Sequence, residues 1–175
     1  MSDATPTTTL ARICAARPCD SGYRKLVKAL GGFRKYGKDT PITVRHIVES
    51  NGLDDALWCL RTMPEHSARW RLLAVRCARR VQHPMADKRS LTALDVAERH
   101  AFGRATDDEL EAARDVAFAA AQDAAGDAAW GAALHNAAEA AYVAAGSAVL
   151  VAGRWEEESE WQAQELIRIS EEDAR

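Results

Sequence analysis

The chain has 175 residues, of which 47% are hydrophobic and 28% charged, with a net charge of -3. This length suits one domain of ordinary size, and the composition excludes a disordered or collagen-like chain. No stretch approaches the roughly 18 apolar residues of a membrane span, and the start lacks the pattern of a signal peptide, so we expect a cytoplasmic protein with reduced cysteines.

Residues 1–9 are polar and rich in Thr, and we expect them to be flexible. Capping residues, Gly pairs and prolines then mark the ends of the elements that follow. They predict helices at about 10–17, 20–30, 41–49, 53–60, 64–81 and 87–102. Residues 33–39 are predicted to be a basic loop.

The second half begins with a capping-box pattern, in which Glu109 follows the predicted N-cap Thr106 by three residues. From residue 112 to residue 152, 20 of 41 residues are Ala, the best helix former. The polar face of this stretch shifts between its two ends, which predicts a helix break near Gly126–Gly131 and a second near Gly146 or Gly153. A last helix is expected over 155–170. Because no period-two pattern competes, the sequence predicts an all-α fold of about eight antiparallel helices.

The two halves of the chain carry opposite charge. Residues 1–100 hold 18 Lys and Arg against 10 Asp and Glu, a net charge of +8, and residues 101–175 hold 5 against 16, a net charge of -11. We therefore predict one domain over 1–175, with a basic helical half at 10–103 and an Ala-rich acidic half at 106–175 that attract each other when folded.

No arrangement of residues indicates catalysis or metal binding. The four cysteines lack the paired C-x2-C spacing of zinc sites, and the five histidines lack metal-ligand spacing. Neither a nucleophile motif nor a phosphate-binding loop is present. The sequence therefore predicts no enzyme, no metal site and no cofactor. These cysteines are Cys14, Cys19, Cys59 and Cys77.

Three arginines, Arg69, Arg76 and Arg80, share one face of the predicted 64–81 helix. Such a ridge can contact phosphate or can meet the acidic half of the same chain. We favour the second interpretation because no recognised DNA-binding motif accompanies the ridge.

The segment 155–161 combines acids with two tryptophans, and Trp161 lies away from the apolar face of its predicted helix. An exposed Trp among acids is typical of a binding anchor, whereas the alternative is that Trp161 packs on an arginine stem of the basic half. We predict a partner-binding surface here. Its residues are Trp155, Glu156, Glu157, Glu158, Glu160 and Trp161.

The stretch Glu49-Ser-Asn-Gly-Leu-Asp-Asp-Ala-Leu-Trp-Cys-Leu-Arg61 resembles a block in Ala- and Trp-rich helical proteins of bacteria and phages. These are grouped as immunity proteins, similar to the fifth immunity class. Residues 74–81, 93–99 and 106–114 resemble further blocks, and the likeness covers most of 20–170. This chain departs from the pattern because only Trp130 remains as a repeat Trp and acids replace many arginines. The resemblance implies an antagonist that neutralises a toxin or effector by binding it, and it brings no catalytic residues.

We therefore expect a non-catalytic inhibitor that binds a protein target with a basic surface, rather than a membrane or, directly, a nucleic acid. One alternative is a phage counter-defence protein of the anti-CRISPR kind, whose acidic half would occlude a basic nucleic-acid channel. A second alternative is a nucleic-acid-binding protein that uses the basic N-terminal half.

Overall fold

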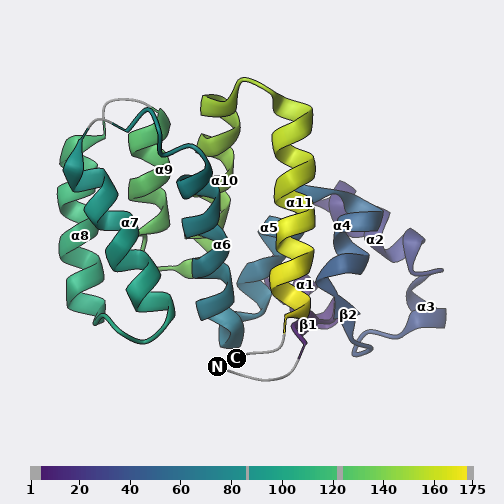
Figure 1. The fold of residues 1–175 in the computed structure, drawn as a ribbon. Helices are drawn as coiled ribbons and strands as arrows, with labels where there is room; N and C mark the ends of the chain where they lie inside the picture. Colours follow the sequence, from purple (N-terminus) through teal and green to yellow (C-terminus); the bar gives the residue numbers. More distant parts are fainter. Residues whose placement is uncertain (1–4, 86, 122–123, 173–175) are drawn as a thin grey trace. The chain divides into compact units, whose positions relative to one another are not determined.

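The computed structural model describes residues 5–85, 87–121 and 124–172 (Figure 1). In these residues the chain forms eleven α-helices, two 3-10 turns and one pair of very short strands. The predicted all-α class is confirmed. The predicted number of about eight helices was too low, partly because residues 33–39, expected to be a loop, contain the single-turn helix α3 (Phe33–Tyr36).

The chain divides into two compact units, and this division does not follow the predicted basic and acidic halves. The first unit contains the residues up to 66 together with those from 163 onward, and the second contains residues 67–162. The first unit holds β1 (Thr7–Thr8), α1 (Leu10–Ala15), α2 (Asp20–Ala29), α3, β2 (Ile42–Thr43), α4 (Val44–Asn51), α5 (Leu53–Cys59), η1 (Leu60–Thr62) and η2 (Pro64–His66). The second unit holds α6 (Ser67–Arg80), α7 (Lys88–Ala101), α8 (Asp107–Ala120), α9 (Ala124–Ala132) and α10 (Ala137–Ala152). The last helix, α11 (Trp155–Glu171), contributes residues to both.

The start of the chain is built into the first unit. β1 pairs with β2 in an antiparallel register that sets Thr8 opposite Ile42. The Thr8 side chain is buried, and its hydroxyl lies 2.7 Å from the hydroxyl of Thr62. Thr9 also caps α1, so the predicted flexibility of residues 1–9 is wrong for Thr7–Thr9. Residues 1–4 lie outside the described part of the chain.

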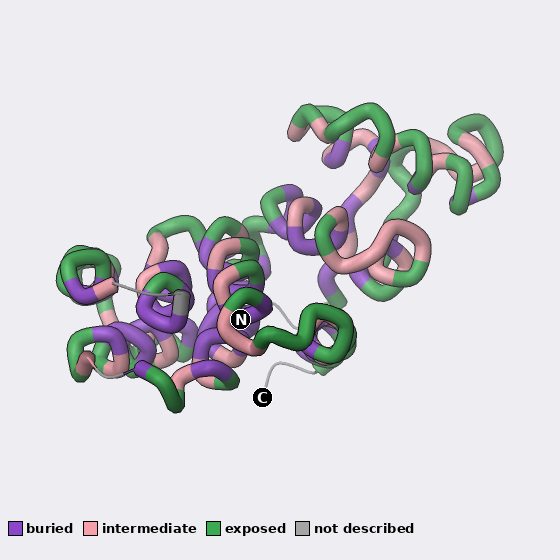
Figure 2. Tube along the Cα trace, turned by 90° about the horizontal axis from the view of Figure 1, so that it is seen from above, coloured by how far each residue is buried: buried purple, intermediate pink, exposed green. Residues whose placement is uncertain are grey.

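The second unit is an array of helices whose inner faces are lined by alanine. α10 packs against α6 and α9, and α6 also contacts α7. Figure 2 shows the buried sides of these helices turned toward one another and the exposed sides turned outward. Small side chains permit close helix–helix approach, which explains why the Ala-rich stretch forms the centre of this unit. The alanines of α10 with the least exposure are Ala140, Ala141, Ala144 and Ala148.

The helix break predicted near Gly126–Gly131 is misplaced, because α9 runs through both glycines. Gly131 serves close packing instead. A Cβ atom there would lie 2.8 Å from the Val143 Cγ1 of α10, closer than real Cβ contacts allow. The second predicted break is confirmed at Gly153, which ends α10 in the left-handed conformation at φ 64°.

Candidate functional site

The predicted surface lies on the first two turns of α11. Gly153 ends α10, and α11 begins two residues later with Glu156, Glu157 and Glu158 in its first turn. Carboxylates are stabilised at a helix N-terminus by the macrodipole and by unpaired backbone N–H groups. This local effect accounts for three consecutive acids at the start of a helix.

Glu158 points into the second unit rather than toward solvent, with only 3% of its side chain exposed. The Arg80 Nε donates to one of its carboxylate oxygens at 2.6 Å, and the Gln162 amide donates to the other at 3.2 Å. Gln162 also donates to the Ala145 carbonyl oxygen at 3.0 Å, which fixes the amide against α10. The buried carboxylate is thus fully engaged by its own unit.

Trp161 is half-buried, and the Arg80 guanidinium carbon lies 4.5 Å from the centre of its ring. Of the two interpretations left open by the sequence, the structure therefore shows the Trp packed on an arginine of the basic half. Trp161 lies three residues after Glu158, so both side chains share one face of α11 and one arginine. These two residues hold the helix in place within the second unit.

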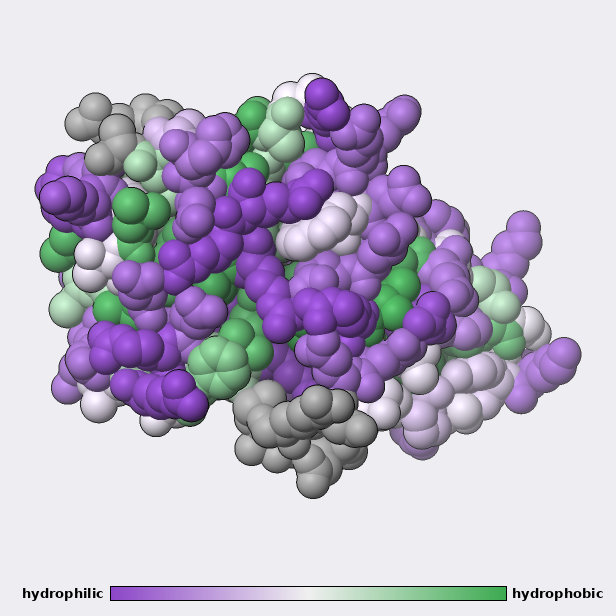
Figure 3. Space-filling model, in the orientation of Figure 1, coloured by the Kyte–Doolittle hydropathy of each residue, from purple (hydrophilic) through white to green (hydrophobic). Residues whose placement is uncertain are grey.

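The remaining predicted residues are exposed. Trp155 is 64% exposed, and the side chains of Glu156, Glu157 and Glu160 face solvent. Leu150, near the end of α10, is 73% exposed and lies five positions before Trp155 across the Gly153 turn. Figure 3 shows apolar and hydrophilic atoms side by side at this turn, at the top of the view. We refer to Leu150, Trp155, Glu156, Glu157 and Glu160 as the acidic turn.

Sequence reasoning missed Leu150 because it stands in an apolar, Ala- and Val-rich stretch that is mostly core. The available signal was its position on the helix. Leu150 lies about 140° from the mid-direction of Ala144 and Ala148 on a helical wheel, which places it on the side away from the alanine face. A large apolar side chain on the outer face of a helix whose inner face is alanine marks a candidate contact.

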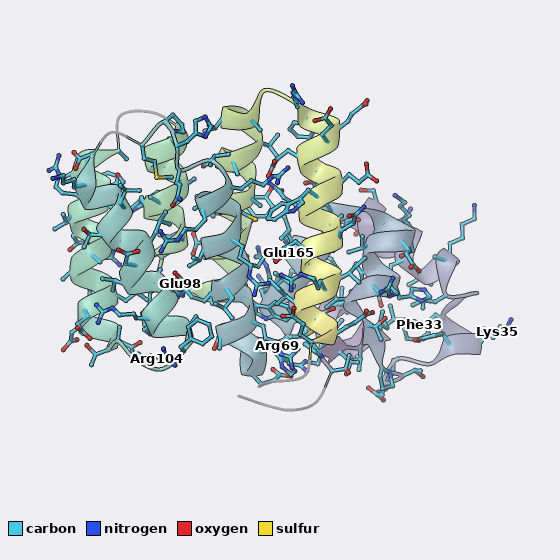
Figure 4. The ribbon with its side chains drawn as sticks, in the orientation of Figure 1. Phe33, Lys35, Arg69, Glu98, Arg104 and Glu165 are labelled. Atoms are coloured by element: carbon cyan, nitrogen blue, oxygen red, sulfur yellow. The ribbon has the colours of Figure 1, made fainter. Side chains whose placement is uncertain are left out.

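The arginine ridge of α6 is engaged within the protein. Arg80 meets Glu158 of the acidic half, as predicted, whereas Arg69 is buried and Arg76 is half-buried. The neighbouring Arg79 donates to Asp95 at 2.6 Å and to Glu98 at 2.9 Å, both on α7. Figure 4 labels Arg69 on α6 and Glu98 on α7. The ridge therefore does not form an open surface for phosphate.

One pair of titratable side chains connects two helices of the second unit. The His100 Nε2 lies 2.8 Å from the Asp107 carboxylate, which links the end of α7 to the start of α8. This hydrogen bond is the main reason why the pKa of Asp107 lies below its usual range. Within the described ranges, no three His, Cys, Asp or Glu side chains gather in a manner that could hold a metal ion.

The four cysteines form no disulfide; Cys14 and Cys19 are exposed, and Cys59 and Cys77 are buried. Burial raises the pKa of the Cys59 thiol to about 12. Since the thiolate is the nucleophile, Cys59 is unreactive at neutral pH.

No helix in the described part of the chain has both the length and the apolar character that crossing a bilayer requires. Comparisons with protein-family models, with curated proteins and with solved structures found no match.

Proposed function

We propose that this protein is a non-catalytic inhibitor of the immunity type, which neutralises a toxin or effector by binding it through the acidic turn. The observation that carries the proposal is the exposure of two large apolar side chains, Leu150 and Trp155, close in sequence to three solvent-facing glutamates. Trp is among the residues most enriched at the energetic centres of protein interfaces. The resemblance of residues 49–61 to immunity proteins supports the same kind of activity.

The charge of the acidic turn indicates the chemistry of the target. One of its glutamates, Glu157, pairs with Arg154 at 3.1 Å, but both side chains are mostly exposed and such pairs contribute little. A target surface rich in Lys and Arg would complement these carboxylates and would be captured faster because of long-range attraction. The nucleic-acid channel of a defence complex is one surface of this kind.

The test is capture of proteins from the lysate of the native host on immobilised wild-type protein and on four variants. We expect one protein to bind the wild type and to be lost with Trp155→Ala. In a titration with the purified partner, Trp155→Ala should weaken binding by about 30-fold or more, the loss expected of an interface anchor. The triple Gln variant of Glu156, Glu157 and Glu160 should slow association, most strongly at low salt.

Phe118→Ala is the matched control, because Phe118 is 66% exposed in the same unit but lies on α8. This variant should bind the partner as the wild type does. Trp161→Ala serves as a second control: it should lower the melting temperature, because Trp161 packs on Arg80, whereas Trp155→Ala should leave the melting temperature unchanged. If no bound protein depends on Trp155, or if Phe118→Ala has the same effect, the proposal is wrong.

A further inference from the structure

A second charged surface lies in the first unit, on α2 and α3. Residues 24–38 contain six Lys and Arg and no Asp or Glu, and we refer to this stretch as the basic segment. All six side chains are exposed to solvent. They are Arg24, Lys25, Lys28, Arg34, Lys35 and Lys38.

These cations differ from the other arginines of the same unit in having few anionic partners. Arg12 makes a two-pronged ion pair with Glu65, and Arg45 makes another with Glu171. In the basic segment, Arg24 lies 3.8 Å from Asp20, and both side chains are more than four-fifths exposed. Lys28, Arg34, Lys35 and Lys38 form no ion pair with any described carboxylate. These four positive charges are therefore not neutralised by ion pairs with the described residues and are available to an anionic ligand.

Backbone hydrogen bonds hold the basic segment in a fixed conformation. α2 ends in a Schellman motif, in which the Gly32 N–H donates to the Val27 carbonyl oxygen at 2.9 Å and the Gly31 N–H donates to Lys28. The Ala11 N–H donates to the Lys38 carbonyl oxygen at 2.9 Å, which ties the far end of the segment to α1. The cations are thus presented on an ordered scaffold, which lowers the entropic cost of binding.

The turn of α3 brings the Lys35 side chain back to the end of α2. The backbone of Gly31 is left-handed at φ 84°, and the aliphatic part of the Lys35 side chain passes close enough to touch a Cβ atom built there. The ammonium of Lys35 lies 3.7 Å from the same position, so it sits at the C-terminal end of α2. Lys35, labelled in Figure 4, lies at the outer edge of α3.

An aromatic ring accompanies these charges. Phe33, the first residue of α3, is 48% exposed and directly precedes Arg34 and Lys35. Among the described residues of the first unit, it is the one large apolar side chain that is exposed. The neighbouring Tyr36 is held differently, because its hydroxyl donates to the Pro41 carbonyl oxygen at 2.7 Å.

We propose that the basic segment binds single-stranded nucleic acid, with its Lys and Arg side chains on the phosphates and a base stacked on Phe33. Cations along a surface combined with an exposed ring are the two elements of sequence-tolerant single-strand binding. An anionic membrane would be held by a wider apolar face than one phenylalanine provides. An acidic protein would satisfy the cations, but it would not supply phosphates and bases in regular alternation as a nucleic-acid strand does.

The experiment measures binding of a fluorescent 20-nucleotide oligo(dT) to the full-length protein over a series of salt concentrations. With four unpaired cations in contact with phosphates, log K should fall with log salt with a slope of about -3. Lys28→Gln, Arg34→Gln and Lys35→Gln together should make the slope shallower by about 2. Phe33→Leu should weaken binding by roughly 5- to 100-fold, as expected for loss of one stacked base, whereas Phe33→Tyr should retain it.

The matched control removes three positive charges from the second unit with Lys88→Gln, Arg104→Gln and Arg154→Gln, all at exposed positions. This variant should keep the wild-type slope. Circular dichroism should show all variants folded, since every changed side chain faces solvent. The proposal is overturned if oligo(dT) does not bind at low salt, if the control loses as much affinity as the basic-segment variant, or if phosphatidylserine vesicles or polyglutamate compete better than the oligonucleotide.

Discussion

Replacing Arg71 with methionine is expected to lower the free energy of unfolding by about 3–5 kcal/mol, because it leaves one buried and two partly buried carbonyl groups without this donor. Arg71 lies on α6 and is only 2% exposed. Its guanidinium donates to the Ala132 carbonyl oxygen at 2.9 Å and to the His135 carbonyl oxygen at 2.7 Å, and it also donates to Leu134. These carbonyls at and just after the end of α9 belong to the groups that a helix cannot satisfy itself.

Burial lowers the pKa of Arg71 to about 10, so the side chain is still charged at neutral pH. Urea denaturation of the wild type, Arg71→Met and Arg71→Lys measures the effect. The Lys variant keeps the charge but not the planar fork, and it should recover only part of the lost stability. A loss below about 1 kcal/mol in the Met variant would show that water replaces the guanidinium and that the contact is dispensable.

Substitution of Gly131 by leucine is expected to destabilise the protein by about 3 kcal/mol or more, because the first added carbon already collides with α10. The position of its Cβ lies 2.8 Å from Val143 Cγ1 and 3.1 Å from the backbone nitrogen of Ala144, and a backbone atom cannot move aside cheaply. The remaining three carbons of leucine would have to force α9 and α10 apart.

Gly146 provides the matched control within α10 itself. A Cβ atom there would meet nothing within 4 Å, and the residue is exposed. Gly146→Leu should therefore raise stability by about 0.5–1 kcal/mol through helix propensity alone. Thermal unfolding of both variants compares the two positions directly. If the two substitutions shift the melting temperature in the same direction, the close approach at Gly131 does not limit the packing.

The two glycines show which parts of the fold can be predicted from sequence. Helix ends follow local rules, so the capping box of Thr106 and Glu109 and the end at Gly153 are confirmed. A glycine that allows two helices to touch looks the same in sequence as one that breaks a helix. Sequence alone therefore assigns Gly131 to a break, because the reason for this glycine lies in Val143, twelve residues away in sequence and on another helix.

In the candidate site, only the helix face on which each residue lies could be predicted, because this follows from helical periodicity. Periodicity placed Trp161 off the apolar face of its own helix, but it could not show that Arg80 covers the ring. It placed Glu158 about 100° nearer to that apolar face than Glu157, but a carboxylate is expected at the surface, and only the structure shows that Arg80 and Gln162 engage it in a buried position. Arg71 was missed for the same physical reason, because the carbonyls that hold its charge come from residues about sixty positions later.

The burial of two thiols gives each unit its own chemical reporter of local opening. Cys59 belongs to the first unit and Cys77 to the second, and neither is accessible to an alkylating reagent in the native protein. Cys14 and Cys19 are exposed and can be blocked beforehand. Modification of Cys59 and Cys77 then requires transient unfolding of the unit that contains each thiol. Mass spectrometry of the two cysteine-containing peptides measures the two labelling rates, and these rates report how often each unit opens. Equal labelling rates across a urea series would indicate that the two units unfold together in one cooperative transition. Different rates would indicate that each unit unfolds with its own free energy.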